Sequence, residues 1–192
     1  MIKTVCVFCG ANAGLRPVFS DAAKALGTLM ARRNLAVVYG GGNVGLMGVL
    51  ADAALTAGGE VIGVIPKSLM ERELAHTGVS ELHVVATMHE RKALMADLSD
   101  AFIALPGGFG TLDEFFEILT WAQLGIHSKP CGVLNVDSYF DNLLAFLDRA
   151  VKEGLLLAQN RRLFAVEHDA STLLEALEIQ STGVPGVQKD VR

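Results

Sequence analysis

The residues best suited to chemistry follow a short apolar run, in the stretch ALPGGFGTLDEFFEIL at positions 104–119. Three glycines would let the backbone fold tightly and approach a ligand. They are Gly107, Gly108 and Gly110. Thr111 could offer its hydroxyl or cap the following helix, whose first N–H groups attract anions such as phosphate. Because Asp113 and Glu114 come directly after this loop, the stretch predicts an anion site with carboxylates beside it.

Glu114 has two interpretations. Thr111 and Glu114 fit the capping-box pattern, in which the glutamate reaches back to the cap amide and only stabilises its own helix. Alternatively, Glu114 acts on a ligand held by the loop.

The polar arc of this helix also carries Trp121, and aromatic residues are enriched at ligand clefts and subunit interfaces. We therefore expect this arc to border a cleft or another subunit.

A second glycine-rich turn, GGGNVG at 40–45, lies between a predicted strand and a predicted helix. This context suits a phosphate bound by backbone amides, with Gly42 and Gly45 as the candidate contacts. A dinucleotide site also needs an acidic residue at the end of the next strand, about 20 residues further on. The strand VIGVIPK has none, so the turn predicts a phosphate site or close packing rather than an NAD site.

Arg91 lies in the third candidate segment, at 88–102. It falls within an apolar stripe at helical spacing that consists of Met88, Met95 and Leu98. The arginine either extends along this stripe to water or reaches into a pocket, where its planar guanidinium meets a phosphate or carboxylate. Lys92 borders the stripe and would add positive charge.

Composition narrows the class of protein. The 192 residues suit one domain, and a net charge of −5 argues against nucleic acid or an anionic membrane as the main partner. No apolar run approaches the length of about 20 residues that a membrane span needs, and the first residues lack signal-peptide features, so we expect a cytoplasmic protein. The histidines show no metal-ligand spacing. Cys6 and Cys9 lie in a predicted strand with side chains on opposite faces, so packing is expected rather than metal binding.

Short apolar runs alternate with helical patterns along the chain. Strands are predicted at 4–10, 35–40, 60–66, 81–86, 101–105, 130–136 and 163–168, and helices at 17–33, 45–58, 88–98, 111–124, 138–153 and 170–179. Such alternation predicts a single-domain, doubly wound α/β fold with a parallel, Rossmann-like sheet. We expect this domain to span 1–180, a disordered tail to follow at 181–192, and 66–80 to form the longest irregular connection. Ligands should bind where the strand order changes direction.

Several motifs in order resemble the Lonely Guy family of cytokinin riboside 5′-monophosphate phosphoribohydrolases, long labelled lysine decarboxylases. They are YGGGNVGLMG, VIPKSLMERE, MHERK, PGGFGTLDE and TWAQLGIHSKPCGVLNVDSYFDNLLAFLDRAVKEG, and the match covers about residues 3–157. The resemblance implies hydrolysis of the N-glycosidic bond of adenine-type nucleoside 5′-monophosphates, including AMP, to free base and ribose 5-phosphate. It also implies a homodimer or larger assembly, with the face around Trp121 as candidate interface, and no metal or organic cofactor.

By motif, the family's catalytic pair falls on Arg91 and Glu114. The implied nucleotide contacts are Glu73, Lys92, Gly107, Gly108, Phe109, Gly110, Thr111, Leu112, Asp113 and Thr120. A carboxylate such as Glu114 would stabilise an oxocarbenium-like transition state and activate water. The chain departs from the family at Ala11 and Asn12, where two serines are usual.

Three other functions remain open from the sequence. A non-catalytic nucleotide or molybdenum-cofactor carrier on the same fold would need the glycine loops but not a carboxylate aimed at the ribose. An NAD-dependent oxidoreductase would need the missing ribose-binding acid. A purely interacting protein would use the face around Trp121, which the enzyme also predicts as an interface.

Overall fold

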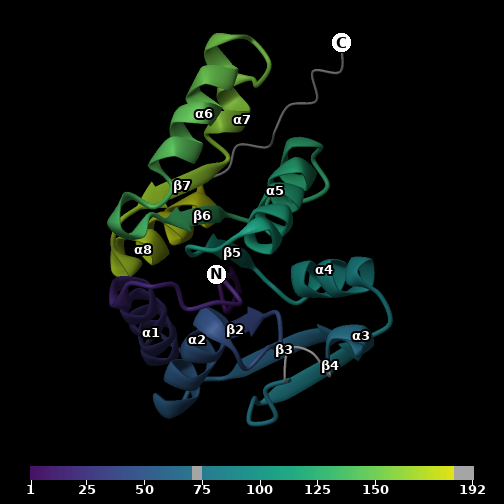
Figure 1. Cartoon of the computed structure of the whole chain (residues 1–192). Coiled ribbons are helices and arrows are strands. Elements are labelled where there is room, and N and C mark those ends of the chain that lie inside the picture. The colour runs from purple at the N-terminus through teal and green to yellow at the C-terminus, as the bar shows by residue number, and fades with distance from the viewer. Residues whose placement is uncertain (71–74, 184–192) are drawn as a thin grey trace.

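The computed structural model describes residues 1–70 and 75–183, and their strands form one seven-stranded sheet (Figure 1). The strand order is β4-β3-β2-β1-β5-β6-β7, and every neighbouring pair is parallel. The strands are β1 Thr4–Phe8, β2 Ala36–Tyr39, β3 Val61–Pro66, β4 Glu81–Val85, β5 Ala101–Ala104, β6 Cys131–Leu134 and β7 Phe164–Glu167. The expected doubly wound α/β fold is confirmed.

Helices cover both faces of the sheet (Figure 1). On one face lie α1 Pro17–Arg32, α2 Gly45–Thr56 and α8 Ala170–Thr182, which share a core cluster with the sheet. On the other lie α4 Met88–Asp97, α5 Phe109–Gln123 and α6 Asp141–Lys152. Three short helices complete the set: α3 Lys67–Met70, α7 Ala158–Arg161 and the 3-10 turn η1 Val136–Ser138.

Because both faces are covered, the central strands are buried on both sides, as their continuous apolar sequences predicted. Cys6 packs in the cluster with α4 and α5, whereas Cys9 packs in the cluster with α1 and α2. The two thiols therefore point to opposite faces, as expected. Burial raises the pKa of each thiol, so both cysteines stay protonated and serve as packing residues.

The strand order changes direction next to β1. From β1 the chain adds β2, β3 and β4 on one side, then returns to place β5 on the other side. The carboxyl ends of β1 and β5 therefore open into a crevice, which is where doubly wound sheets bind ligands. The loops that follow these two strands must form its walls.

Some boundaries differ from expectation. The connection expected to be irregular from residue 66 opens with α3, α5 begins at Phe109 rather than at 111, and α7 was not predicted. The last helix continues to Thr182, and residues 184–192 of the expected tail lie outside the described residues. Within residues 1–70 and 75–183, no helix has the length and apolar character needed to cross a membrane.

Candidate active site

A cavity of about 210 Å³ lies at the carboxyl ends of β1 and β5, where the strand order predicts a ligand. Two loops form most of its wall, residues 10–14 after β1 and 106–108 after β5. Phe19, Leu46 and Tyr139 complete the lining. Since all of these side chains are uncharged, a bound anion would be met here mainly by backbone N–H groups.

Close backbone packing joins the two loops. Gly10 donates its N–H to the Pro106 carbonyl at 3.1 Å. A Cβ atom on Gly107 would lie 2.1 Å from Thr111 Oγ1 and 2.9 Å from the Gly10 nitrogen, so only glycine fits at this position. The close approach of these segments thus explains the first glycine of the PGGFG motif, whereas a Cβ on Gly108 or Gly110 would meet no atom within 4 Å.

The other glycine turn supports this wall from behind. Gly45 has a φ of +60°, and a Cβ there would lie 2.2 Å from the Ala11 carbonyl carbon. Gly42 forms an isolated bridge with Ala75. Neither glycine lines the cavity. Gly45 packs against the loop after β1, whereas Gly42 pairs with Ala75 outside both loops.

The first turn of α5 opens at this wall. The helix begins at Phe109 with Gly108 as N-cap, and no side chain caps it. Thr111 therefore lies inside the helix, and Glu114 makes its bond to another helix. The capping-box interpretation is wrong, because the helix starts three residues earlier than the pattern requires and the carboxylate of Glu114 is engaged elsewhere.

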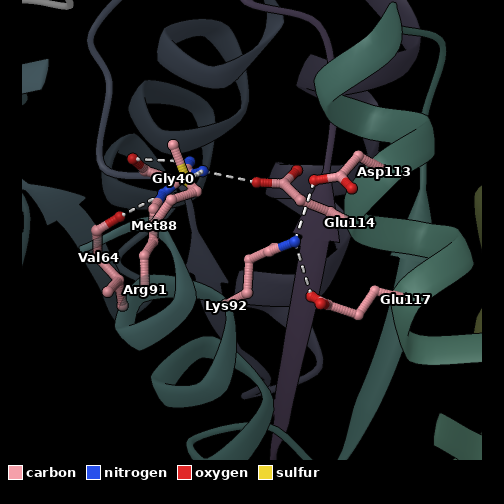
Figure 2. Close-up of polar contacts among 8 residues, drawn as sticks. All are labelled: Gly40, Val64, Met88, Arg91, Lys92, Asp113, Glu114 and Glu117. Atoms are coloured by element: carbon pink, nitrogen blue, oxygen red, sulfur yellow. Dashed lines mark hydrogen bonds and ion pairs between the residues drawn. The ribbon is translucent and has the colours of Figure 1, made fainter.

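Arg91 and Glu114 form a buried ion pair between α4 and α5 (Figure 2). Arg91 Nη1 donates to Glu114 Oε1 at 2.7 Å, and the two side chains are only 9% and 11% exposed. Arg91 Nε donates to the Val64 carbonyl at 3.0 Å and Nη2 to the Gly40 carbonyl at 3.2 Å. The guanidinium reaches into the interior instead of extending to water.

The ends of two strands thus hold the arginine in one orientation. A Cβ on Gly40 would lie 2.0 Å from Arg91 Nη2, so the first glycine of GGGNVG leaves room for the guanidinium. This role was not predicted from the sequence, where the motif suggested only phosphate binding or close packing. A planar guanidinium with fixed partners presents its charge to Glu114 without rearrangement.

Two opposing effects act on the Glu114 carboxyl. Burial raises its pKa, while the nearby Arg91 charge lowers it, and the net pKa lies above the ordinary glutamate value. The carboxylate is close enough to Cys9 to raise the pKa of that thiol further, after burial. Gly108, the N-cap of α5, lines the cavity, and Glu114 lies in the second turn of the same helix, so the carboxylate lies at the end of α5 that opens at the cavity.

Lys92 joins the same two helices next to this pair (Figure 2). Its Nζ lies 3.2 Å from Asp113 Oδ2 and 3.0 Å from Glu117 Oε2. Burial alone would lower the pKa of Lys92, but the hydrogen bonds to Glu117 and Asp113 outweigh it and the pKa is raised. Lys92 is therefore a firmly charged group beside Glu114.

The remaining predicted contacts are placed differently. Phe109 is exposed at the first position of α5, and Leu112 is partly buried against the core. Thr120 donates its hydroxyl to the Phe116 carbonyl at 2.7 Å and lines a separate hollow between α5, α6 and α7, so the structure does not bring it to the cavity. Glu73 lies outside the described residues.

Sequence reasoning missed part of the wall. It did not select Gly10, Gly14 or Tyr139, all of which line the cavity. The small residues of CGANAG directly after the central strand were an available signal for the first two. Among the described residues, no group of three or more His, Cys, Asp or Glu side chains is arranged to hold a metal ion.

Comparisons with known proteins identify relatives of this chain. Residues 47–177 match a family described as "Possible lysine decarboxylase". The chain is 52% identical over 176 residues to cytokinin riboside 5′-monophosphate phosphoribohydrolase LOG1 of Arabidopsis thaliana, covering 92% of this chain and 83% of that protein. It is 53% identical to probable cytokinin riboside 5′-monophosphate phosphoribohydrolase LOGL9 of Oryza sativa subsp. japonica, covering 92% and 78% of the two chains.

A solved structure supports the fold. The molybdenum cofactor binding protein of Rippkaea orientalis superposes with a TM-score of 0.70 at 24% identity, covering 93% of this chain and 96% of that one. At this level of sequence identity, the similarity shows the fold alone. The much higher identity to the plant proteins, over almost the whole chain, confirms the resemblance that the motifs indicated. The chain belongs to the Lonely Guy family of cytokinin riboside 5′-monophosphate phosphoribohydrolases.

Proposed function

We propose that this protein hydrolyses the N-glycosidic bond of adenine-type nucleoside 5′-monophosphates, cytokinin riboside 5′-monophosphate and AMP among them, to free base and ribose 5-phosphate. The observation that carries the proposal is the buried Arg91–Glu114 pair beside a cavity walled by glycine loops. The relatives named above support the same reaction.

The 5′-phosphate binds at the cavity, against the first-turn amides of α5. Helix N-termini favour anions through their free N–H groups and their dipole. Gly107, Gly108 and the following turn up to Asp113 are the proposed contacts, with Lys92 adding positive charge from α4. Fixing the phosphate in this way sets the position of the ribose relative to Glu114.

Glu114 acts at the anomeric carbon. As the C1′–N9 bond breaks, its electron pair leaves with the base, and a carboxylate stabilises the positive charge that develops on the ribose. Water adds to C1′ and gives up a proton to Glu114, while the base takes up a proton from solvent on release and Glu114 then returns its own proton to solvent. Arg91 acts mainly by orienting Glu114, because its Nε and both Nη atoms already have partners in the protein.

The test is to incubate the protein with AMP and with isopentenyladenosine monophosphate, and to measure free base and ribose 5-phosphate. We expect both products from at least one of the two substrates, in equal amounts. Tight binding of nucleotides with no free base from either would contradict the proposal and favour the carrier function.

We also propose a homodimer whose interface includes the face around Trp121. Trp121 is half-buried against the core, and next to it Leu124 and Ile126 are 66% and 64% exposed. Exposed apolar residues grouped in this way mark interaction surfaces. The three free cysteines, all buried, are consistent with the cytoplasmic location that we propose for the reaction.

A further inference from the structure

Tyr139 contacts the glycine loop from a distant part of the chain. Its hydroxyl donates to the Gly107 carbonyl at 2.8 Å, across a separation of 32 residues. Tyr139, Gly107 and Gly108 all line the cavity. The hydroxyl thus bonds to the loop at the position where the proposed phosphate site begins.

This bond holds the Gly107–Gly108 peptide at its carbonyl end. At its Gly108 end this peptide has open space beside it, because a Cβ on Gly108 would meet no atom within 4 Å. In a trans peptide the carbonyl and the next N–H point in opposite directions, and the described residues contain no cis bond. By holding the Gly107 carbonyl, Tyr139 therefore also sets the direction of the Gly108 N–H. The Gly107 carbonyl oxygen, which is the negative end of this peptide, stays hydrogen-bonded to Tyr139 and does not face the anion.

The turn that carries Tyr139 is strained. Asp137 and Ser138 have φ values of 50° and 60°, a region that residues with a side chain seldom adopt. Asn135, 2% exposed, holds the turn by accepting from the Phe140 N–H at 2.8 Å and donating to Asp141 at 2.7 Å. Strain that the surroundings maintain is often associated with functional sites.

The tyrosine ring is held independently of its hydroxyl. Phe19, another lining residue, lies edge-on to it with ring centroids 5.5 Å apart, and Phe140 does so at 5.0 Å. Tyr139 is 46% exposed, and neither of these ring contacts involves its hydroxyl. Removing the hydroxyl should therefore free the Gly107 carbonyl without displacing the ring.

We propose that Tyr139 is a positioning residue for the 5′-phosphate. It orients the Gly107–Gly108 peptide so that the loop and the first turn of α5 present donors to the anion. This inference rests on the proposed function, since it takes the cavity as the phosphate site. It adds a residue that reaches the substrate only through the backbone of the loop.

The test is Tyr139→Phe, with Tyr39→Phe as a matched control. Tyr39 is the other tyrosine of the chain, and its buried hydroxyl has no hydrogen-bond partner in the part of the chain that the structure describes. For Tyr139→Phe we expect KM for AMP to rise roughly three- to tenfold, as for one lost hydrogen bond, with kcat little changed. Tyr39→Phe should leave both constants unchanged.

Calorimetric binding to AMP, ribose 5-phosphate and adenine separates positioning from general damage. The loss in Tyr139→Phe should affect the two phosphorylated ligands and spare adenine. An unchanged affinity for ribose 5-phosphate, or an equal loss for adenine, would overturn the inference. If the wild type binds AMP but does not cleave it, the proposed function fails, while the binding series still decides the role of Tyr139.

Discussion

Arg91 and Glu114 face each other in a site that excludes most water. Removing two charges from water is costly, and the attraction between them offsets that cost only with good geometry and further hydrogen bonds. Here the Gly40 and Val64 carbonyls supply those bonds to Arg91. The pair therefore keeps a charged carboxylate available in a dry site, where its effect on a developing cation is largest.

Substituting Glu114→Gln tests this residue directly. The amide keeps the shape and can still accept a bond from Arg91, so AMP binding should persist, while kcat should fall by roughly 100- to 10,000-fold through loss of the base. Initial rates of adenine release and calorimetric AMP binding would measure the two effects. Glu153→Gln, at an exposed position of another helix end, should behave as wild type. Turnover near the wild-type rate in Glu114→Gln would exclude a catalytic role.

The pH profile gives a second test of Glu114. Burial is the main cause of its raised pKa, so the carboxyl is more easily protonated than an ordinary glutamate. Only the ionised form can accept a proton, so kcat/KM should rise with pH through a limb that lies above the ordinary glutamate pKa. A profile that is flat until the pH falls below the ordinary glutamate range would contradict this assignment.

At the scale of elements, the site depends on the approach of β2 to α4. The carboxyl end of β2 passes so close to Arg91 that position 40 has no room for a side chain. Helix α4, which carries Arg91, is also linked to α5 by Lys92, which bonds to Asp113 and Glu117. Two helices and one strand end together set the direction of the guanidinium.

Substituting Gly40→Ala should disturb this arrangement. The new methyl group would lie 2.0 Å from Arg91 Nη2, so the arginine must move and release the Gly40 carbonyl or Glu114. We expect a lower Tm and a large loss of kcat, measured by thermal unfolding and adenine release. Gly110→Ala adds the same methyl group where no atom lies within 4 Å, and its Tm should not fall. Equal Tm values for Gly40→Ala and the wild type would show that the close contact is relieved at no cost.

At the scale of the whole molecule, an exposed apolar surface lies beyond the end of α5. Leu124 and Ile126 lie exposed at the end of this helix, on the face of the sheet opposite to α8. A second copy would bury them and Trp121 together, next to the helix that carries Glu114. The proposed dimer would therefore affect both the rigidity of the site and the solubility of the protein.

Charge placed on this surface should separate the copies. The double substitution Leu124→Glu, Ile126→Glu should shift the mass in light scattering from dimer to monomer, because burying two carboxylates at an apolar interface is unfavourable. Ile179→Glu, also exposed but on α8, is the control and should leave the mass unchanged. A double variant that remains dimeric would place the interface elsewhere, and a monomeric wild type would refute the homodimer.

Much of the fold and part of the site could be predicted from the sequence, because these features have local signals. Continuous apolar strands between helical patterns indicated a parallel sheet buried on both faces, and the structure confirms all seven strands. The apolar stripe around Arg91 left two placements open, and the structure shows the buried one. The anion site at the PGGFG loop stays a prediction. The motifs in order indicated the family, which the relatives confirm.

Only the tertiary structure decided what these residues contact. The capping pattern at Thr111 and Glu114 is equally consistent with a local bond and with the bond to Arg91 that the fold provides. Arg91 meets a carbonyl 51 residues away at Gly40, and Tyr139 meets one 32 residues away at Gly107. No local pattern encodes such contacts, because they arise when strand ends, loops and helices from distant parts of the chain converge at one edge of the sheet.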